Sequence, residues 1–140
     1  MAEPFELEII SMKGPVYEGP CLSLSVPTEK GPLVIEPGYT NYIGALSPAG
    51  VLKVVTPERT DFYAVFGGVV DVKRNVKVSL FTEEINNGYE IDLARAMAAR
   101  DRNLDRIEKH EEGIDLIRAK IKLAKALVRI DVKRLSEGNN

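Results

Sequence analysis

The stretch NNGYEIDLARA, residues 86–96, separates two halves of the chain that differ in composition. All 8 prolines lie within the first 57 residues, and only 2 of the 11 glycines lie beyond residue 88. Proline and glycine are typical of turns between short strands, and their scarcity favours long helices. The sequence therefore predicts one domain at residues 1–88 and a second at residues 89–140.

Apolar and polar residues alternate in the first half, as they do in β-strands that bury one face. The alternation is clearest at residues 5–9, 22–26 and 76–80, and further apolar runs occupy residues 33–35, 51–55, 62–66 and 69–72. We expect Gly67 and Gly68 to form a turn between two of these strands. Because no helical segment interrupts the series, the first domain is predicted to be an all-β antiparallel sandwich or barrel.

The second half carries the apolar spacing of two helices. Asp92 is a good N-cap for the first helix, which we expect to end near Gly113. The second helix is expected at about residues 114–135. Its predicted apolar seam consists of Ile114, Ile117, Ile121, Ala124, Val128, Val132 and Leu135. Two helices joined by so short a turn predict an antiparallel α-helical hairpin.

Charge is distributed unequally between the two predicted helices. Residues 114–135 contain seven basic and two acidic residues, a net charge of +5, whereas residues 90–112 contain five basic and seven acidic residues, a net charge of −2. One interpretation is that these charges only solvate the outer faces of the hairpin. The other is that the second helix docks on an acidic partner surface through Arg118, Lys122, Lys125 and Arg129.

The composition excludes several functional classes. The chain has 140 residues and a formal net charge of −2, so a global basic field of the kind that binds nucleic acid is absent and we expect no nucleic-acid partner. With Cys21 and His110 as the single cysteine and histidine, the chain contains neither a tetrahedral zinc set nor a Ser-His-Asp arrangement. We expect structural roles for both residues, no required cofactor, no metal site and no catalytic residues. The first 12 residues lack the pattern of a signal peptide, and no apolar run is long enough to span a bilayer.

Several segments, in their order and spacing, carry a resemblance to a known family. They are the turn GPLVIEPG at residues 31–38, LSPAG at residues 46–50, the strand pair with its two glycines at residues 63–72, and IDLARA at residues 91–96. The chain resembles the epsilon subunit of the bacterial F-type ATP synthase over nearly its whole length. It departs from the family pattern at Tyr39, where a histidine is usual, and at Pro32, where a glutamate is common.

The resemblance implies a non-catalytic subunit of the central stalk. Its sandwich of about ten short strands would bind the gamma subunit and touch the c-subunit ring, coupling ion translocation to ATP synthesis. Its hairpin would either fold onto the sandwich or extend along the shaft, where it inhibits ATP hydrolysis by docking on an acidic surface of the beta subunit. The subunit would then be peripheral to the cytoplasmic face of the bacterial cell membrane.

The segment at residues 91–96 also resembles a motif that binds ATP as a regulatory ligand in several bacterial members. The resemblance assigns nucleotide contacts to Ile91, Asp92, Arg95 and Ala96, and phosphate contacts to Arg102 and Arg129. Asn86 and Lys125 differ from the residues found in members that bind ATP well. Asp92 is equally explained as a plain N-cap. An alternative for the whole chain is a free-standing ATP-sensing module.

Overall fold

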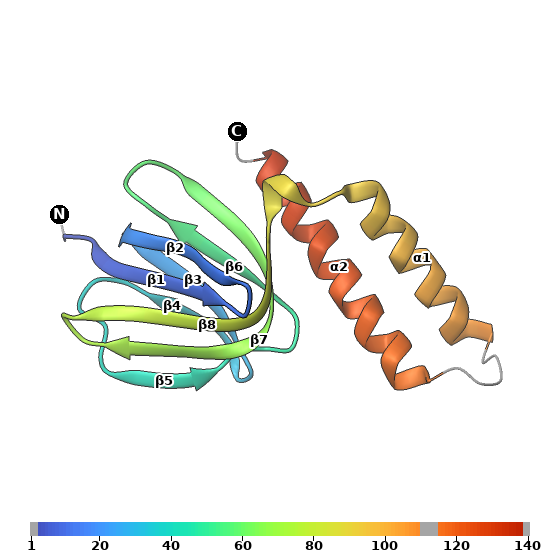
Figure 1. Ribbon diagram of the computed structural model, residues 1–140, viewed down its shortest axis with the longest axis horizontal. Coiled ribbons are helices and arrows are strands. Elements are labelled where there is room, and N and C mark those ends of the chain that lie inside the picture. The colour runs from blue at the N-terminus through green and yellow to red at the C-terminus, as the bar shows by residue number, and fades with distance from the viewer. Residues whose placement is uncertain (1–2, 110–114, 139–140) are drawn as a thin grey trace.

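The computed structural model describes residues 3–109 and 115–138, which form a β-sandwich and a helical hairpin packed beside it (Figure 1). The strands are β1 (Phe5–Ser11), β2 (Gly14–Cys21), β3 (Ser23–Thr28), β4 (Gly31–Ile35), β5 (Tyr42–Ala45), β6 (Gly50–Val55), β7 (Thr60–Lys73) and β8 (Lys77–Asn87). A short 3-10 helix, η1 (Gly88–Glu90), leads into α1 (Leu93–Lys109), and α2 (Leu116–Gly138) follows.

The strands pair in the order β2-β1-β8-β7-β6-β3-β4, and β5 pairs with β7. The two ends of this path do not pair with each other, so the sheet folds over as a sandwich and not as a closed barrel. The pairing is antiparallel except between β1 and β8, which run parallel with Leu7 opposite Val78. The expected all-β sandwich is confirmed, with this one parallel pair as a departure from the antiparallel expectation.

The expected turn at Gly67 and Gly68 is wrong, because both residues lie inside the 14-residue strand β7. Their φ angles are +78° and +128°, so the strand bends there while remaining paired with β8. A Cβ on Gly68 would collide with the carbonyl oxygen of Phe81 in β8. Glycine is therefore required for close approach within a strand. The apolar runs at residues 62–66 and 69–72 form one strand, and the described residues contain eight strands where about ten were expected.

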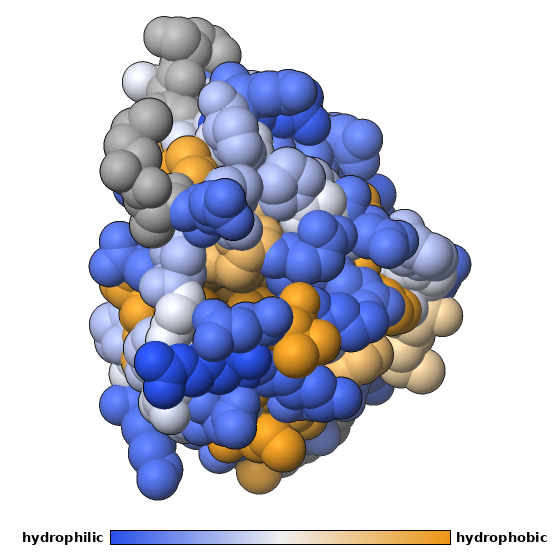
Figure 2. All heavy atoms as spheres, turned by 90° about the vertical axis from the view of Figure 1, so that its left-hand side faces the viewer, coloured by the Kyte–Doolittle hydropathy of each residue, from blue (hydrophilic) through white to orange (hydrophobic). Residues whose placement is uncertain are grey.

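The main core lies between the two layers of the sandwich. It is built from the inward-facing residues of the strands, which are almost fully inaccessible to solvent: Leu7, Ile9, Leu24, Val26, Ile35, Leu52, Val54, Val65, Val70 and Leu80. Their period of two confirms the strand pattern predicted from the sequence. Figure 2 views the end of the sandwich away from the helices, where hydrophobic side chains lie in separate patches among hydrophilic ones.

The two helices pack side by side as the predicted hairpin (Figure 1). The predicted N-cap is confirmed, because the carboxylate of Asp92 accepts a hydrogen bond from the backbone N–H of Arg95 at 3.1 Å. The predicted end of the first helix near Gly113 lies outside the described residues. The second helix extends to Gly138, three residues further than expected.

The predicted apolar seam of α2 is largely wrong. Ile117 and Ile121 are 72% and 52% exposed, and Leu135 is also exposed, whereas the buried residues are Ala119, Ala126, Ile130, Val132 and Ser136. The reason is that α2 contacts two surfaces. It packs along α1, and its residues Val128 and Val132 pack on the sandwich around Ala64 and Phe66. A single seam describes a helix with one partner, so it misplaces the buried face here.

Candidate nucleotide and docking site

A cavity of about 530 Å³ lies where the sandwich, η1 and the two helices meet. It is lined by Lys13, residues 84–87 of β8, residues 90–92, Arg95, Ala96 and Ala99 of α1, and Ala126 and Arg129 of α2. Its volume is in the range of small-molecule sites. The end of the last strand and the start of α1 build most of its wall, so the segment that separates the two halves of the sequence also forms the site.

Five of the six predicted nucleotide residues line this cavity: Ile91, Asp92, Arg95, Ala96 and Arg129. The sixth, Arg102, is not among the lining residues. It follows Arg95 by seven residues, which places it two turns and about 10 Å further along α1. The structure thus brings the 91–96 segment together with Arg129 and leaves Arg102 exposed outside the cavity.

The side chains of residues 91–96 differ in whether they are available to a ligand in the cavity. Ile91 is 8% exposed and packs in the small core beneath α2, so little of its side chain is accessible to a ligand. Asp92 caps α1, as described above. Arg95 is exposed and makes no ion pair with another described residue, so its guanidinium is available to an anion in the cavity.

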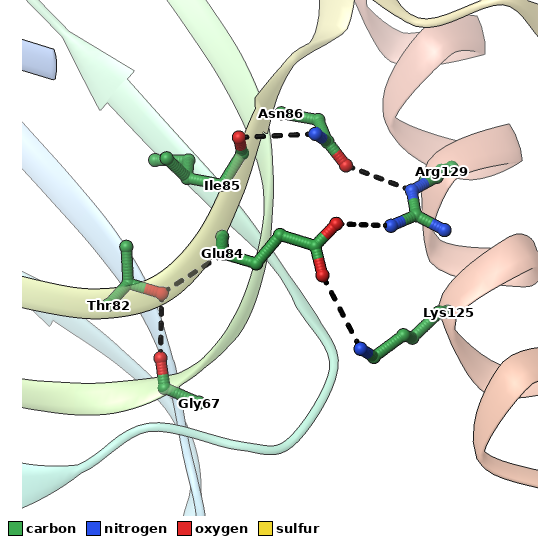
Figure 3. A network of polar contacts seen from close by, with 7 residues as sticks. All are labelled: Gly67, Thr82, Glu84, Ile85, Asn86, Lys125 and Arg129. Carbon is green, nitrogen blue, oxygen red and sulfur yellow. Dashed lines mark hydrogen bonds and ion pairs between the residues drawn. The ribbon is translucent and has the colours of Figure 1, made fainter. Parts of the chain in front are cut away.

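Arg129 is held by the last strand of the sandwich (Figure 3). Its Nη2 lies 2.7 Å from Oε2 of Glu84, and its Nε donates to Oδ1 of Asn86 at 2.9 Å. The guanidinium also lies over the ring of Phe66, 4.7 Å from its centre. Lys125, one turn earlier in α2, reaches Oε1 of Glu84 at 3.4 Å and lies over the same ring at 5.2 Å.

Glu84 is the residue of this candidate site that sequence reasoning missed. It joins two cations of α2 that follow it by 41 and 45 positions in the chain. The signal in the sequence was an acidic pair, Glu83 and Glu84, at the end of a strand, together with two basic residues four apart on a helix. Nothing in the sequence indicated that the two features face each other.

The four predicted docking residues, Arg118, Lys122, Lys125 and Arg129, are spaced by 4, 3 and 4 residues and therefore share one face of α2. We call this set the cationic stripe. The sandwich divides it. Arg118 and Lys122 are exposed, whereas Lys125 and Arg129 are only 32% and 28% exposed and are engaged with Glu84. The stripe is not fully available to a partner while α2 lies on the sandwich.

The remaining sequence candidates have structural surroundings. The thiol of Cys21 is buried, and its sulfur lies 3.3 and 3.4 Å from the carbonyl oxygens of Ser23 and Val55, either of which can accept its single hydrogen. His110 lies outside the described residues. Residues 3–109 and 115–138 contain no group of three potential metal ligands, and none of their helices has the length and apolar character needed to cross a membrane.

Comparison with known proteins identifies the family. Residues 4–88 match the family model of the ATP synthase Delta/Epsilon chain beta-sandwich domain, and residues 90–134 match that of its long alpha-helix domain. The ATP synthase epsilon chain of Bacillus licheniformis is 33% identical over 129 residues, covering 92% of this chain and 97% of that one. The epsilon chain of Nitrosococcus oceani is 30% identical over 131 residues, covering 93% and 92%.

Solved structures share the fold. A chain in the mitochondrial ATP synthase of Euglena gracilis, in a structure of OSCP, F1 and c-ring, superposes with a TM-score of 0.80 at 20% identity, covering 91% of this chain and 79% of that one. A chain from the central stalk and c-ring of the Tetrahymena thermophila enzyme superposes with a TM-score of 0.56 at 14% identity, covering 96% of each chain.

The sandwich, the hairpin and the two family matches define a subunit class and not a catalytic fold. The chain belongs to the ATP synthase delta/epsilon chain family. Its curated relatives are epsilon chains, which are non-catalytic stalk subunits of the ATP synthase complex, in agreement with the expectation that this chain is not an enzyme by itself. The division into two independently folding domains at residue 88 stays a prediction.

Proposed function

We propose that this chain couples ion translocation to ATP synthesis through its sandwich and inhibits ATP hydrolysis through its hairpin. The observation that carries the regulatory part is the divided cationic stripe. Two of its residues are exposed and two are paired with Glu84, so full use of the stripe requires α2 to leave the sandwich. A helix that exposes different charges in two positions has the property that a switch requires.

The contacts that hold α2 on the sandwich support a reversible arrangement. The apolar part is a small cluster in which Val132 and Val128 meet Ala64 and Phe66, separate from the main core. The polar part consists of the partly exposed pairs at Glu84, which contribute modestly to stability. Detachment of α2 would leave the core of the sandwich intact, so the hairpin can move without unfolding the first domain.

The outer face of the sandwich offers a surface for the gamma subunit. Val69 of β7 is opposite Phe81 of β8, which in turn is opposite Ile10 of β1, and Ala45 of β5 is opposite Val69. Residues at matching positions of paired strands project to the same side of a sheet. Val69 and Phe81 are 40% and 45% exposed, so this cross-strand row presents an apolar band to a partner.

The far end of the sandwich suits the contact with the c-subunit ring (Figure 2). A cavity of about 450 Å³ there is lined by residues 3–6, 35–39 and 72–78. It includes Tyr39, the position at which the sequence departs from its family. Through the gamma subunit and the ring the chain would be peripheral to the cytoplasmic face of the bacterial membrane. The third partner, the beta subunit, would receive the cationic stripe.

We propose ATP as a regulatory ligand of the 530 Å³ cavity, because Arg95 and Arg129 both line it and Arg95 makes no ion pair with another described residue. A nucleotide that used Arg129 would have to compete with Glu84 for it. Titration calorimetry with MgATP should give a binding heat that Arg95→Ala abolishes. An absence of heat at millimolar MgATP would contradict this ligand, and with it the alternative function as a free-standing ATP sensor.

The main proposal is tested by ATP hydrolysis in a purified catalytic complex that lacks its own epsilon subunit. The complex is titrated with the full chain and with a version that ends at Gly88. Both should bind, since the main core lies within the sandwich, and only the full chain should slow hydrolysis. Binding of both without inhibition would remove the regulatory role and keep the coupling role. Failure of both to bind would contradict the proposed assembly.

A further inference from the structure

Two cationic side chains of α2 converge on one carboxylate between the sandwich and α2, and a third side chain holds one of the two cations (Figure 3). Lys125 and Arg129 each bind one oxygen of Glu84, and Asn86 accepts from the Arg129 Nε beside it. We call Lys125, Arg129 and Asn86 the cation cradle. Two cations that meet around one carboxylate form a binding site for an oxyanion, and charge-assisted contacts of this kind are stronger than neutral ones. The oxyanion that fills this site belongs to the chain itself.

Neighbouring residues hold the two cations of the cradle and the Glu84 carboxylate in position. Phe66 lies beneath both cations, so the ring orients them toward β8. The backbone at Glu84 is fixed in turn by Thr82, whose hydroxyl donates to the Gly67 carbonyl oxygen at 2.7 Å and lies 3.1 Å from the Glu84 carbonyl oxygen. The bend in β7 and the end of β8 thus position the carboxylate under α2.

We propose that Glu84 acts as an internal competitor for the two inner cations of the cationic stripe and thereby controls release of α2 from the sandwich. This regulation rests on the proposed function, in which the stripe docks on an acidic protein surface. The Nη2 and Nε atoms of Arg129 are both engaged in the cradle, so an external carboxylate forms a two-point ion pair with this edge of the guanidinium only by displacing Glu84 and Asn86.

Because the stripe is divided, its four cations would meet the carboxylates of a partner in a fixed order. Arg118 and Lys122 are exposed while α2 lies on the sandwich, so they meet an acidic surface first. Lys125 and Arg129 follow when the carboxylate of Glu84 is exchanged for one of the partner. Every step replaces one carboxylate by another at the same cations, so neither cation is left without an anion during docking.

The exposure of the Glu84 side chain determines how strongly removal of its charge should affect the release of α2. The side chain of Glu84 is 43% exposed, and partly exposed pairs are screened by water and salt. We therefore expect Glu84→Gln to raise the ratio of detached to attached α2 by roughly fivefold. The matched control is Glu83→Gln, which makes the same charge change one residue earlier. Glu83 is exposed and makes no ion pair with a described residue, so this variant should leave the ratio unchanged.

The experiment measures α2 directly in the full chain. Spin labels are placed at Glu29→Cys in the turn after β3 and Lys120→Cys on α2, both exposed positions, and the native Cys21 is buried. The label distance distribution gives the detached fraction. Glu84→Gln should increase this fraction, and added salt should increase it in the parent chain more than in the variant. Equal fractions in Glu84→Gln, Glu83→Gln and the parent chain would overturn the proposal.

Inhibition assays separate this proposal from the proposed function. If both hold, Glu84→Gln should inhibit the catalytic complex at a roughly fivefold lower concentration than the parent chain, matching its larger detached fraction. Detachment without any change in inhibition would leave the role of Glu84 in place and contradict docking through the stripe. A change in inhibition without detachment would overturn the role of Glu84, because inhibition would then be altered by another route.

Discussion

Ser136, in the last turn of α2, lies directly against Gly88, the residue that joins β8 to η1. A Cβ on Gly88 would collide with Oγ of Ser136, and Ser136 is 1% exposed. The end of the hairpin therefore packs so closely on Gly88 that its neighbour Ser136 leaves no room for a side chain at position 88. Glycine is needed at position 88 for packing and not for backbone conformation, because Gly88 does not have a positive φ angle.

Substitution of Gly88 by alanine should push the last turn of α2 away from the sandwich. We expect a loss of about 1–3 kcal/mol in the free energy of opening α2, as for other overpacked sites. Hydrogen exchange of the α2 amides measures this. Ser136→Gly in the same chain should restore protection, and Ser136→Ala should restore it less, because the Ser136 Cβ would still lie 2.9 Å from the new methyl group. Equal effects of both second changes would contradict the collision.

Reversal of Lys122 to glutamate should weaken inhibition of ATP hydrolysis and leave assembly unchanged. Lys122 belongs to the cationic stripe, is exposed, and makes no ion pair with a described residue, so its reversal does not disturb the Glu84 pairs. Rim charges of this kind change affinity by up to about tenfold. The matched control is Arg134→Glu, an exposed cation of α2 outside the stripe. Similar inhibition curves for both variants would count against docking through the stripe.

Alanine at Gly68 should destabilise the sandwich by about 3 kcal/mol or more. The new methyl group would meet the Phe81 carbonyl oxygen and lie 2.8 Å from the Cα of Thr82. Gly14→Ala is a matched control, since Gly14 has the same φ of +128° but nothing within 4 Å of the added carbon. Urea denaturation of the two variants separates collision from backbone strain. A similar loss in both would show that strain alone matters.

The free energy of unfolding should fall as pH rises above the ordinary thiol range. Burial raises the pKa of Cys21 from 9.0 to about 11. Between these values the unfolded chain has lost the thiol proton and the folded chain retains it, so stability decreases with rising pH. The contribution of Cys21 is complete below pH 9.0 and is lost as pH rises through about 11. Urea midpoints should show this slope, and Cys21→Ala should reduce it. An unchanged slope in that variant would assign the loss to other groups.

The parts of the fold that were predicted correctly depend on local sequence. The alternation of the strands and the Asp92 cap both report interactions between near neighbours. Gly67 and Gly68 were misplaced because a bend inside a strand and a turn between strands need the same backbone freedom. The bend is distinguished from a turn by the contact of Gly68 with Phe81, which lies 13 positions further along the chain.

The candidate site was predicted only in part for a similar reason. A resemblance in one segment identified Ile91, Asp92, Arg95 and Ala96, which lie together because they fall within one six-residue segment. The cation cradle depends on the rotation of α2 about its axis, which is decided by packing on two surfaces at once. The seam predicted from Ile117 and Ile121 implied a different rotation, and with that rotation the contact of Arg129 with Glu84 was not foreseeable.

The ion pair between Glu84 and Arg129 closes a loop of 45 positions within one chain. Both partners are therefore present at an effective concentration on the order of millimolar, however dilute the protein is. A free carboxylate or phosphate below that level competes poorly for the cation cradle. An acidic segment held in the same assembly is also at a high local concentration, so it competes on equal terms. The Glu84–Arg129 ion pair thus distinguishes tethered anions from free ones by their local concentration and not by their chemistry.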